Sequence, residues 1–250
     1  MTQTETPPIL LYDHIASICS QMARLALVEK GLSFERRQID IMETNEQFEP
    51  WYVALNPRAV VPTLQIGEEV VTDTIRIVQR LQGFPGPDLS GDATAAAWLA
   101  DIMALHYGVL LYRKRLEPDG TAPQIVARGI FLKRLLSERP DLKQLLEARL
   151  EGNRKFQALL EDPKGIEHHL VATRKLIDRM SAELEKRPFL AGTSYSFTDC
   201  FATAALARFT IHGFAKQWEG SALDDYYKRM KARPSFAIAQ VIETGTERDL

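Results

Sequence analysis

The sequence predicts two domains, an α/β domain with a small mixed sheet followed by an all-helical domain. Three observations predict this architecture. Strand and helix patterns alternate at the beginning of the chain, a glycine- and proline-rich stretch then interrupts them, and every later segment has the 3.6-residue period of helices. We therefore expect an α/β domain over residues 1–83, a linker over 84–92 and a helical domain over 93–250.

The first predicted elements are a strand, a helix and a second strand. Ile9–Tyr12 is a short apolar run after two prolines, which fits a buried strand. Ser17–Lys30 is predicted to be helical, because apolar side chains recur on one face and Gly31 can end the helix. Phe34–Asp40 fits the second strand.

A hairpin and a short helix complete the predicted α/β domain. Thr63–Ile66 and Glu69–Thr72 are predicted strands, joined by a turn that contains Gly67. Thr74–Leu81 is amphipathic and short. The order strand, helix, strand, irregular segment, hairpin and helix is typical of thioredoxin-like domains.

Six helices are predicted after the linker, with prolines near their ends, where a proline disturbs a helix least. They span Ala93–Leu116, Gln124–Glu138, Asp141–Leu160, Glu167–Glu185, Ser196–His212 and Leu223–Lys231. We expect the part between Leu111 and Gly165 to form either a lid or an extended helix pair.

Composition excludes several classes of protein. Hydrophobic residues make up 45% and charged residues 26%, which is the range of folded proteins and argues against disorder. A net charge of -2 gives no basic surface for nucleic acid. No apolar run approaches the ~18 residues that a membrane span needs, and Met1–Pro8 lacks the features of a secretion signal. We expect a cytoplasmic protein with no nucleic-acid or membrane partner.

The two cysteines, Cys19 and Cys200, are too few for a disulfide framework or a cysteine-rich metal site. Cys200 lies among apolar residues of a predicted helix, and we expect it in the core. Cys19 falls in the first turn of a predicted helix, where unpaired N–H groups and the helix dipole favour an anion.

Two functional interpretations of Cys19 stand beside a structural one. Its position can lower a thiol pKa from ~8.5 toward neutrality. The same amides, with Ser17 as a hydroxyl donor, can instead stabilise the thiolate of a bound thiol cofactor. In the structural interpretation, Cys19 is simply a small apolar residue at a helix start.

Two further motifs suggest a peptide site. A trans proline at Pro62 would be awkward in a strand, whereas a cis Val61–Pro62 bond would leave the Val61 N–H and C=O for an added peptide strand. Thr74 is expected at the N-cap of a helix, where its hydroxyl and the following amides can hold a carboxylate, and Asp73 can meet an ammonium. Capping alone also explains the last two residues. Their combination with Cys19 indicates a site for a zwitterionic peptide.

These segments resemble the glutathione transferase superfamily. Ser17–Ser20 with Arg24–Leu27 is similar to the serine/cysteine signature of the zeta class, and Phe189–Asp199 is similar to the folding box of the superfamily. Within it, the chain resembles bacterial glutathione-dependent reductive dehalogenases of tetrachloro- and dichlorohydroquinone. That likeness extends through Phe48–Pro50, Val60–Thr72 and Tyr226–Arg233.

The resemblance implies the glutathione transferase fold, glutathione as the cofactor, a homodimer and a set of residue roles. Cys19 matches the redox-active cysteine, Ser17 the partner of the glutathione thiol, and Val61 the backbone anchor for glutathione. Asp73 and Thr74 match the positions that bind the γ-glutamyl group, and threonine keeps the hydroxyl.

The remaining site candidates rest on charge and place in the chain. Arg58 is expected to pair with the glycyl carboxylate. The substrate pocket is expected to include His14, Ile15, His106 and Tyr107, although the last two are also explained by packing. No third ligand accompanies His168 and His169, so we expect no metal.

The function expected from the resemblance is reductive dehalogenation of a halogenated hydroquinone, through a glutathionyl conjugate and a Cys19 mixed disulfide. Three alternatives stay open. They are glutathione-dependent cleavage of aryl ethers or thioethers, isomerisation of maleylacetoacetate-type substrates, and a non-catalytic ligand-binding role on the same fold. Only the first function and the thioether variant of the second call for a reactive Cys19.

Overall fold

The computed structural model describes residues 7–243. Most of Met1–Pro8, the segment expected to lack a secretion signal, lies outside the described residues. Contacts divide the chain into two compact units, Met1–Met103 with Ile177–Leu250, and Ala104–Leu176. The domain boundaries expected at 83 and 93 stay a prediction. Within residues 7–243 no helix has the length and apolar character needed to cross a membrane.

The first unit contains a mixed four-stranded sheet in the order β2-β1-β3-β4. β1 (Ile9–Asp13) runs parallel to β2 (Glu35–Gln38) and antiparallel to β3 (Thr63–Ile66), which pairs with β4 (Glu69–Val71). This confirms the predicted thioredoxin-like sheet. The strands are shorter than predicted at β2 and β4, whose side chains are mostly exposed.

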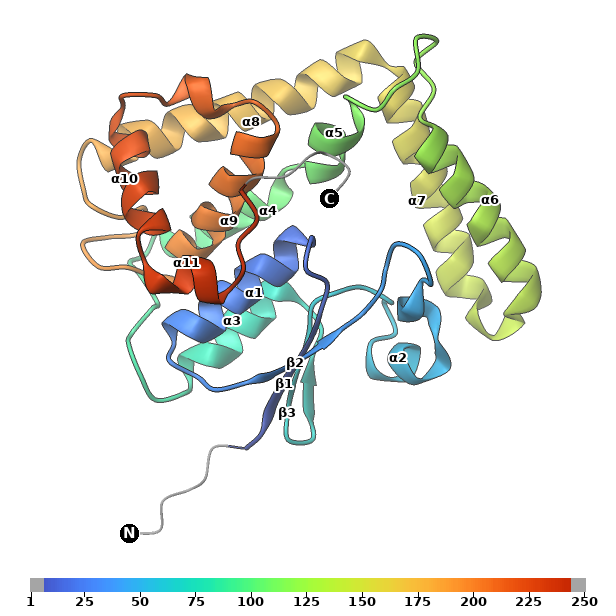
Figure 1. Cartoon of the computed structure of the whole chain (residues 1–250), viewed down its shortest axis with the longest axis horizontal. Helices are drawn as coiled ribbons and strands as arrows, with labels where there is room; N and C mark the ends of the chain where they lie inside the picture. The colour runs from blue at the N-terminus through green and yellow to red at the C-terminus, as the bar shows by residue number, and fades with distance from the viewer. Residues whose placement is uncertain (1–6, 244–250) are drawn as a thin grey trace. The chain divides into compact units, whose positions relative to one another are not determined.

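Side chains of β1 alternate between the two faces of the sheet, as the period of a strand requires. Leu10 and Tyr12 pack in the cluster that includes Tyr52 of α2 (Pro50–Leu55). The other face is covered by α1 (Ile18–Glu29) and α3 (Thr74–Gln82), which pack against each other (Figure 1). The short α2 lies in the segment that sequence patterns left irregular.

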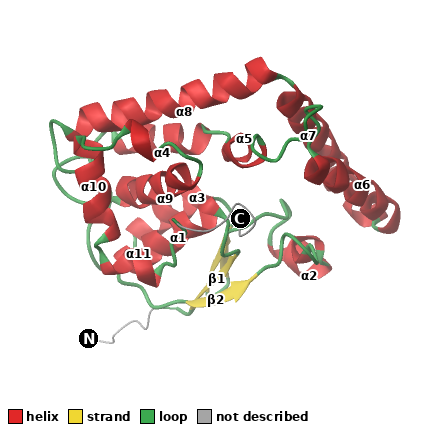
Figure 2. Ribbon diagram, turned by 45° about the horizontal axis from the view of Figure 1, so that its top comes forward, coloured by secondary structure: helices red, strands yellow, loops and turns green. Residues whose placement is uncertain are grey.

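Helix α9 (Phe197–Ile211) forms the centre of the helical part of the first unit and packs against α1 (Figure 2). It starts with a capping box, in which the backbone N–H and the hydroxyl of Ser196 donate to the Asp199 carboxylate. The Asp199 carboxylate also accepts hydrogen bonds from the Leu190 N–H and from the Tyr226 hydroxyl, at 3.2 and 2.8 Å. The folding-box resemblance therefore corresponds to a buried polar cluster.

Other helices of the first unit begin close to their predicted positions. They include α4 (Ala95–Ala104) and α10 (Ala222–Lys231), whereas the short helix α11 (Pro234–Ile238) was not predicted. α8 (Pro163–Leu184), whose residues up to Leu176 belong to the second unit, starts four residues earlier than expected, because Pro163 occupies the first turn, where a missing N–H costs nothing.

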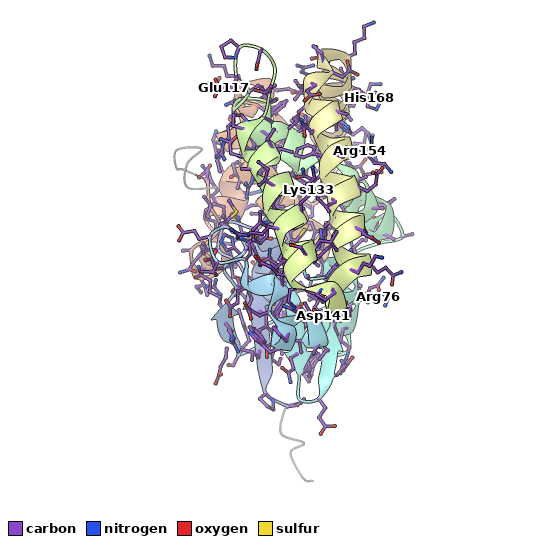
Figure 3. All side chains as sticks on the ribbon, turned by 90° about the vertical axis from the view of Figure 1, so that its right-hand side faces the viewer. Arg76, Glu117, Lys133, Asp141, Arg154 and His168 are labelled. Carbon is purple, nitrogen blue, oxygen red and sulfur yellow. The ribbon has the colours of Figure 1, made fainter. Side chains whose placement is uncertain are left out.

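The second unit centres on an antiparallel pair of helices, α6 (Pro123–Glu138) and α7 (Lys143–Glu161), shown side by side in Figure 3. Of the two expectations for this region, the extended helix pair is the one observed. The Asn153 side-chain amide ties the pair together by donating to the Ile125 carbonyl at 3.0 Å.

The single helix predicted over Ala93–Leu116 is wrong. The helix ends at Ala104, and α5 (Tyr107–Tyr112) starts after His106. The backbone of His106 is not helical, and its ring Nδ1 accepts a hydrogen bond from the Val109 N–H at 3.3 Å. A histidine that caps a helix in this way does not change the apolar period, which explains why the sequence pattern continued across the break.

The buried hydroxyl of Tyr226 generates a stability prediction. Tyr226→Phe should lower the free energy of unfolding by about 2 kcal/mol, because it removes a hydrogen bond to a buried carboxylate. Tyr195→Phe is the matched control. Within residues 7–243 the one hydrogen bond of its hydroxyl is with the Cys200 sulfur, at 3.4 Å, a weak partner, so the loss should stay below about 1 kcal/mol. Urea denaturation measures both, and equal losses would contradict the prediction.

Candidate active site at the start of helix α1

The loop after β1 leads directly into the first turn of α1. Ser17 is the N-cap residue of the helix, with extended backbone angles, and its Oγ accepts a hydrogen bond from the Ser20 N–H at 3.3 Å. Serine is favoured at this position because its oxygen satisfies an unpaired amide. Cys19 is the second residue of α1, in the first turn, as the sequence predicted.

The Cys19 thiol is half-buried. Burial raises the pKa of the Cys19 thiol, and the negative charge of Asp73 acts in the same direction. A hydrogen bond with the Thr74 hydroxyl and the positive charge of Arg208 oppose this rise in pKa without cancelling it. The expected lowering of the pKa is therefore wrong, because desolvation of the thiolate outweighs the favourable end of the helix.

The start of α3 lies against the start of α1 through the contact between Thr74 and Cys19. The N-cap of α3 is Asp73 and not Thr74, so that expectation is corrected. The Asp73 carboxylate accepts hydrogen bonds from two amides of the first turn, at 3.0 and 3.1 Å, which a threonine hydroxyl one residue later could not reach. Thr74 is the first residue of the helix and is buried.

Arg58 and Asp73 lie close to each other in the structure. The Arg58 Nη1 is 3.6 Å from the Asp73 Oδ2, and both side chains are accessible, at 64% and 39% of their full exposure. The sequence assigned these residues to two opposite charges of a zwitterionic peptide. In the structure they form an ion pair with each other.

The Val61–Pro62 peptide bond is cis, which confirms the expectation from the sequence. The preceding carbonyl, of Val60, is held by the Tyr52 hydroxyl at 2.7 Å and the Asn56 amide at 2.9 Å. Within residues 7–243 no hydrogen bond is found for the backbone N–H or C=O of Val61. These two groups lie just before β3, next to the Tyr12–Thr63 pair of the sheet.

The loop that carries His14 and Ile15 is fixed by buried arginines that sequence patterns did not identify as part of a site. Arg24 donates to the carbonyls of His14 and Ile15, at 3.4 and 3.1 Å, and Arg208 donates to that of Ala16 at 2.6 Å. Arg208 could have been noticed, because it is the single basic residue of a helix that is mostly apolar on every side.

His14 lies half-buried beside the helix start. Burial lowers the pKa of His14, while the carboxylates of Asp40 and Asp13 oppose that shift. The His14 Nδ1 accepts a hydrogen bond from the Ala16 N–H at 3.3 Å, so the ring helps to shape the loop.

His106 and Tyr107 belong to the second unit, at the start of α5. His106 stacks on Phe156 with ring centroids 4.8 Å apart and meets His169 edge-on at 5.2 Å. Their assignment to a substrate pocket stays a prediction. In the described part of the chain no three His, Cys, Asp or Glu side chains come together in a way that could hold a metal ion.

Thr74 provides a direct test of what controls the Cys19 thiol. Thr74→Val removes the hydroxyl that lowers the pKa of Cys19, so the pKa should rise further and the thiolate fraction at pH 8 should fall. Alkylation of Cys19 by iodoacetamide across pH, followed by mass spectrometry, measures this. Thr94→Val, at an exposed position, is the control and should leave the profile unchanged. An unchanged profile in Thr74→Val would rule out the hydrogen bond.

Known protein families match this chain over most of its length. The N-terminal domain model of glutathione S-transferases matches residues 16–82, and the C-terminal domain model matches residues 103–234. The tetrachloro-p-hydroquinone reductive dehalogenase of Sphingobium chlorophenolicum is 33% identical over 94% of this chain and 97% of its own length. A zeta-class glutathione S-transferase of Euphorbia esula is 36% identical over 80 residues, 32% of this chain and 35% of its own.

Solved structures show the same fold. A theta-class glutathione S-transferase from Xanthomonas axonopodis pv. citri, solved with glutathione bound, matches with a TM-score of 0.63 and 20% identity, over 96% of this chain and 99% of its own. The sheet, the cis-proline before β3, the serine and cysteine at the start of α1 and the capping box of α9 agree with this relationship. The chain is an enzyme of the glutathione S-transferase family and uses glutathione.

Proposed function

We propose that this enzyme reductively dehalogenates a halogenated hydroquinone at the expense of two glutathione molecules. The observation that carries the proposal is the likeness to a tetrachlorohydroquinone reductive dehalogenase over nearly the whole length of both chains. The presence of Cys19 in the first turn of α1, next to Ser17, supports it, because this chemistry requires a thiol beside the bound glutathione sulfur.

Glutathione is proposed to bind along the edge that Val61 presents. Its cysteinyl residue would pair with the Val61 N–H and C=O as an added strand, and its γ-glutamyl carboxylate would meet the hydroxyl and the backbone N–H of Thr74. Asp73 would receive the ammonium, and Arg58 the glycyl carboxylate. Glutathione would thus exchange the Arg58–Asp73 ion pair for two charge pairs with the peptide.

Thr74 has two roles in this arrangement, and its hydroxyl has one proton. A proton donated to the γ-glutamyl carboxylate is no longer donated to the Cys19 sulfur. Binding of glutathione would therefore change the environment of the thiol as well as bring the substrate sulfur close to it.

The proposed chemistry has three steps. Glutathione thiolate, with Ser17 as hydroxyl donor, attacks the halogen-bearing carbon of an electron-poor tautomer of the ring, so that a C–S bond forms and halide leaves. The Cys19 thiolate then attacks the sulfur of the conjugate, the C–S bond breaks, and the ring takes up a proton. A second glutathione thiolate attacks the mixed disulfide, which yields glutathione disulfide and restores Cys19.

The raised pKa of Cys19 has two opposing effects on the second step. It reduces the thiolate fraction near neutral pH, but a thiolate of higher pKa is intrinsically a stronger nucleophile. The rate of this step should therefore continue to rise with pH above the range of an ordinary cysteine.

The test is Cys19→Ser, incubated with glutathione and a chlorinated hydroquinone. We expect halide release to continue while the glutathionyl conjugate accumulates and the reduced ring no longer forms, because serine cannot accept the glutathionyl group. Mass spectrometry identifies both products and the mixed disulfide. Cys200→Ala, which removes the buried second thiol, is the control and should give the reduced ring. Full reduction by Cys19→Ser would disprove the assignment.

Isomerisation of maleylacetoacetate-type substrates is the second candidate, since the N-terminal part resembles zeta-class enzymes. Addition of glutathione to a conjugated double bond and its later release need no cysteine. Turnover of maleylacetone that survives Cys19→Ser would favour this function. A homodimer and a cytoplasmic location stay predictions.

A further inference from the structure

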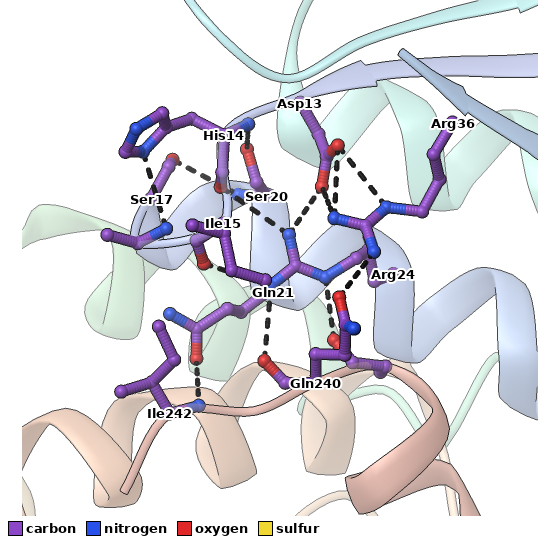
Figure 4. A network of polar contacts seen from close by, with 12 residues as sticks. Asp13, His14, Ile15, Ser17, Ser20, Gln21, Arg24, Arg36, Gln240 and Ile242 are labelled. Atoms are coloured by element: carbon purple, nitrogen blue, oxygen red, sulfur yellow. Dashed lines mark hydrogen bonds and ion pairs between the residues drawn. The ribbon is translucent and has the colours of Figure 1, made fainter. Parts of the chain in front are cut away.

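The C-terminal segment that follows α11 meets the loop of the candidate active site at one buried side chain. Arg24 of α1 is fully buried, and its guanidinium contacts three separate parts of the first unit (Figure 4). These are the end of β1, the loop before Ser17, and the segment from Ala239 to Ile242.

The hydrogen bonds of Arg24 are distributed over all its nitrogens. Nε donates to the Ala239 carbonyl at 2.6 Å, and Nη2 donates to the carbonyls of Ile15 at 3.1 Å and Gln240 at 3.4 Å. Nη1 forms a very short ion pair with Asp13 and donates to the His14 carbonyl at 3.4 Å. The planar, five-donor guanidinium is the side chain that can serve so many acceptors at once.

The C-terminal segment is held at further points. The Ile242 N–H donates to the Gln21 Oε1 at 2.9 Å, and Gln21 lies three residues before Arg24, one turn away on the same helix face. Arg36 donates to the Gln240 Oε1 at 2.5 Å. Gln240 has a φ of 51°, in the left-handed region that few residues other than glycine adopt, so its conformation depends on these contacts.

Arg24 and Arg36 differ in the groups that they contact besides Asp13. The Asp13 carboxylate is fully buried and pairs with both Arg24 and Arg36. Arg36 contacts Asp13 and Gln240 but no carbonyl of the loop, according to the contacts within residues 7–243. Among the residues that the structure describes, only Arg24 joins the loop carbonyls of His14 and Ile15 to the C-terminal segment.

We propose that Arg24 is a positioning residue through which the segment Ala239–Ile242 fixes the loop His14–Ala16, and with it the orientation of Ser17 and Cys19. The C-terminal end thereby becomes part of the active-site framework, although it contributes no group to the chemistry. The inference about the loop stands on the contacts alone, whereas its effect on turnover rests on the proposed glutathione-dependent function.

Two variants and two controls test this proposal. Arg24→Lys keeps a charge beside Asp13 but cannot span the loop and the C-terminal segment, and a chain ending at Ile238 removes the segment. The controls are Arg36→Gln, which removes no hydrogen-bond partner of Arg24, and a chain ending at Glu243. Thermal unfolding of all four confirms that each is folded at the assay temperature.

The first readout is amide hydrogen exchange of residues 14–20 without glutathione. Exchange should become about tenfold faster in Arg24→Lys and in the chain ending at Ile238, and should change by less than about twofold in both controls. An exchange rate of residues 14–20 in the chain ending at Ile238 that equals the wild-type rate would overturn the proposal. So would equal acceleration in Arg24→Lys and Arg36→Gln, which would assign the effect to the charge of Asp13.

The second readout is glutathione-dependent turnover. In the two test variants kcat should fall about tenfold or more while the KM for glutathione changes less, because a displaced sulfur nucleophile affects chemistry more than binding. Loss of kcat with unchanged loop exchange would overturn the proposal. If the wild type shows no glutathione-dependent turnover, the proposed function fails, and the exchange experiment still decides the role of Arg24.

Discussion

The start of α1 depends on the buried ion pair between Asp13 and Arg24. Asp13 ends β1, and Arg24 lies almost two turns inside the helix, so the pair fixes how the strand, the loop and the helix follow one another. Two buried charges are costly to desolvate, and breaking such a pair leaves one of them uncompensated. The many additional hydrogen bonds of Arg24 offset that cost and, in doing so, order the loop before Ser17.

The same burial that orders the helix start also controls the chemistry of Cys19. A helix N-terminus favours a thiolate, but the effect falls off within one turn and is small beside the desolvation of a half-buried sulfur. The Thr74 hydroxyl and the positive charge of Arg208 stabilise the thiolate and so offset part of this rise in the pKa of Cys19. The site therefore holds its cysteine mostly as a thiol, and its reactivity depends on groups contributed by α3 and α9, both far from Cys19 in the sequence.

The proposed glutathione site is built from groups at the start of β3 and the start of α3, together with the Arg58–Asp73 pair. Val61, for which no hydrogen bond is found within residues 7–243, offers its backbone N–H and C=O. Thr74 offers its hydroxyl and its backbone N–H, and the Arg58–Asp73 pair offers two charges of opposite sign. A tripeptide with a carboxylate and an ammonium at one end and a carboxylate at the other is complementary to this pattern. In the proposed function, the added strand brings the glutathione sulfur to Ser17 and Cys19. Cys19 can then remove the glutathionyl group from the conjugate, as the proposed reductive dehalogenation requires.

The sequence by itself determined the sheet, the helix starts at Ser17 and Ser196, and the cis bond before Pro62, because short-range periodicity, capping residues and proline encode these features locally. It could not determine the break at His106, the N-cap role of Asp73 or the direction of the Cys19 pKa shift. The roles of Arg24 and Arg208 were also decided by the tertiary structure alone. These features depend on which distant groups surround a side chain and on how much water those groups exclude. The local sequence pattern does not contain this information.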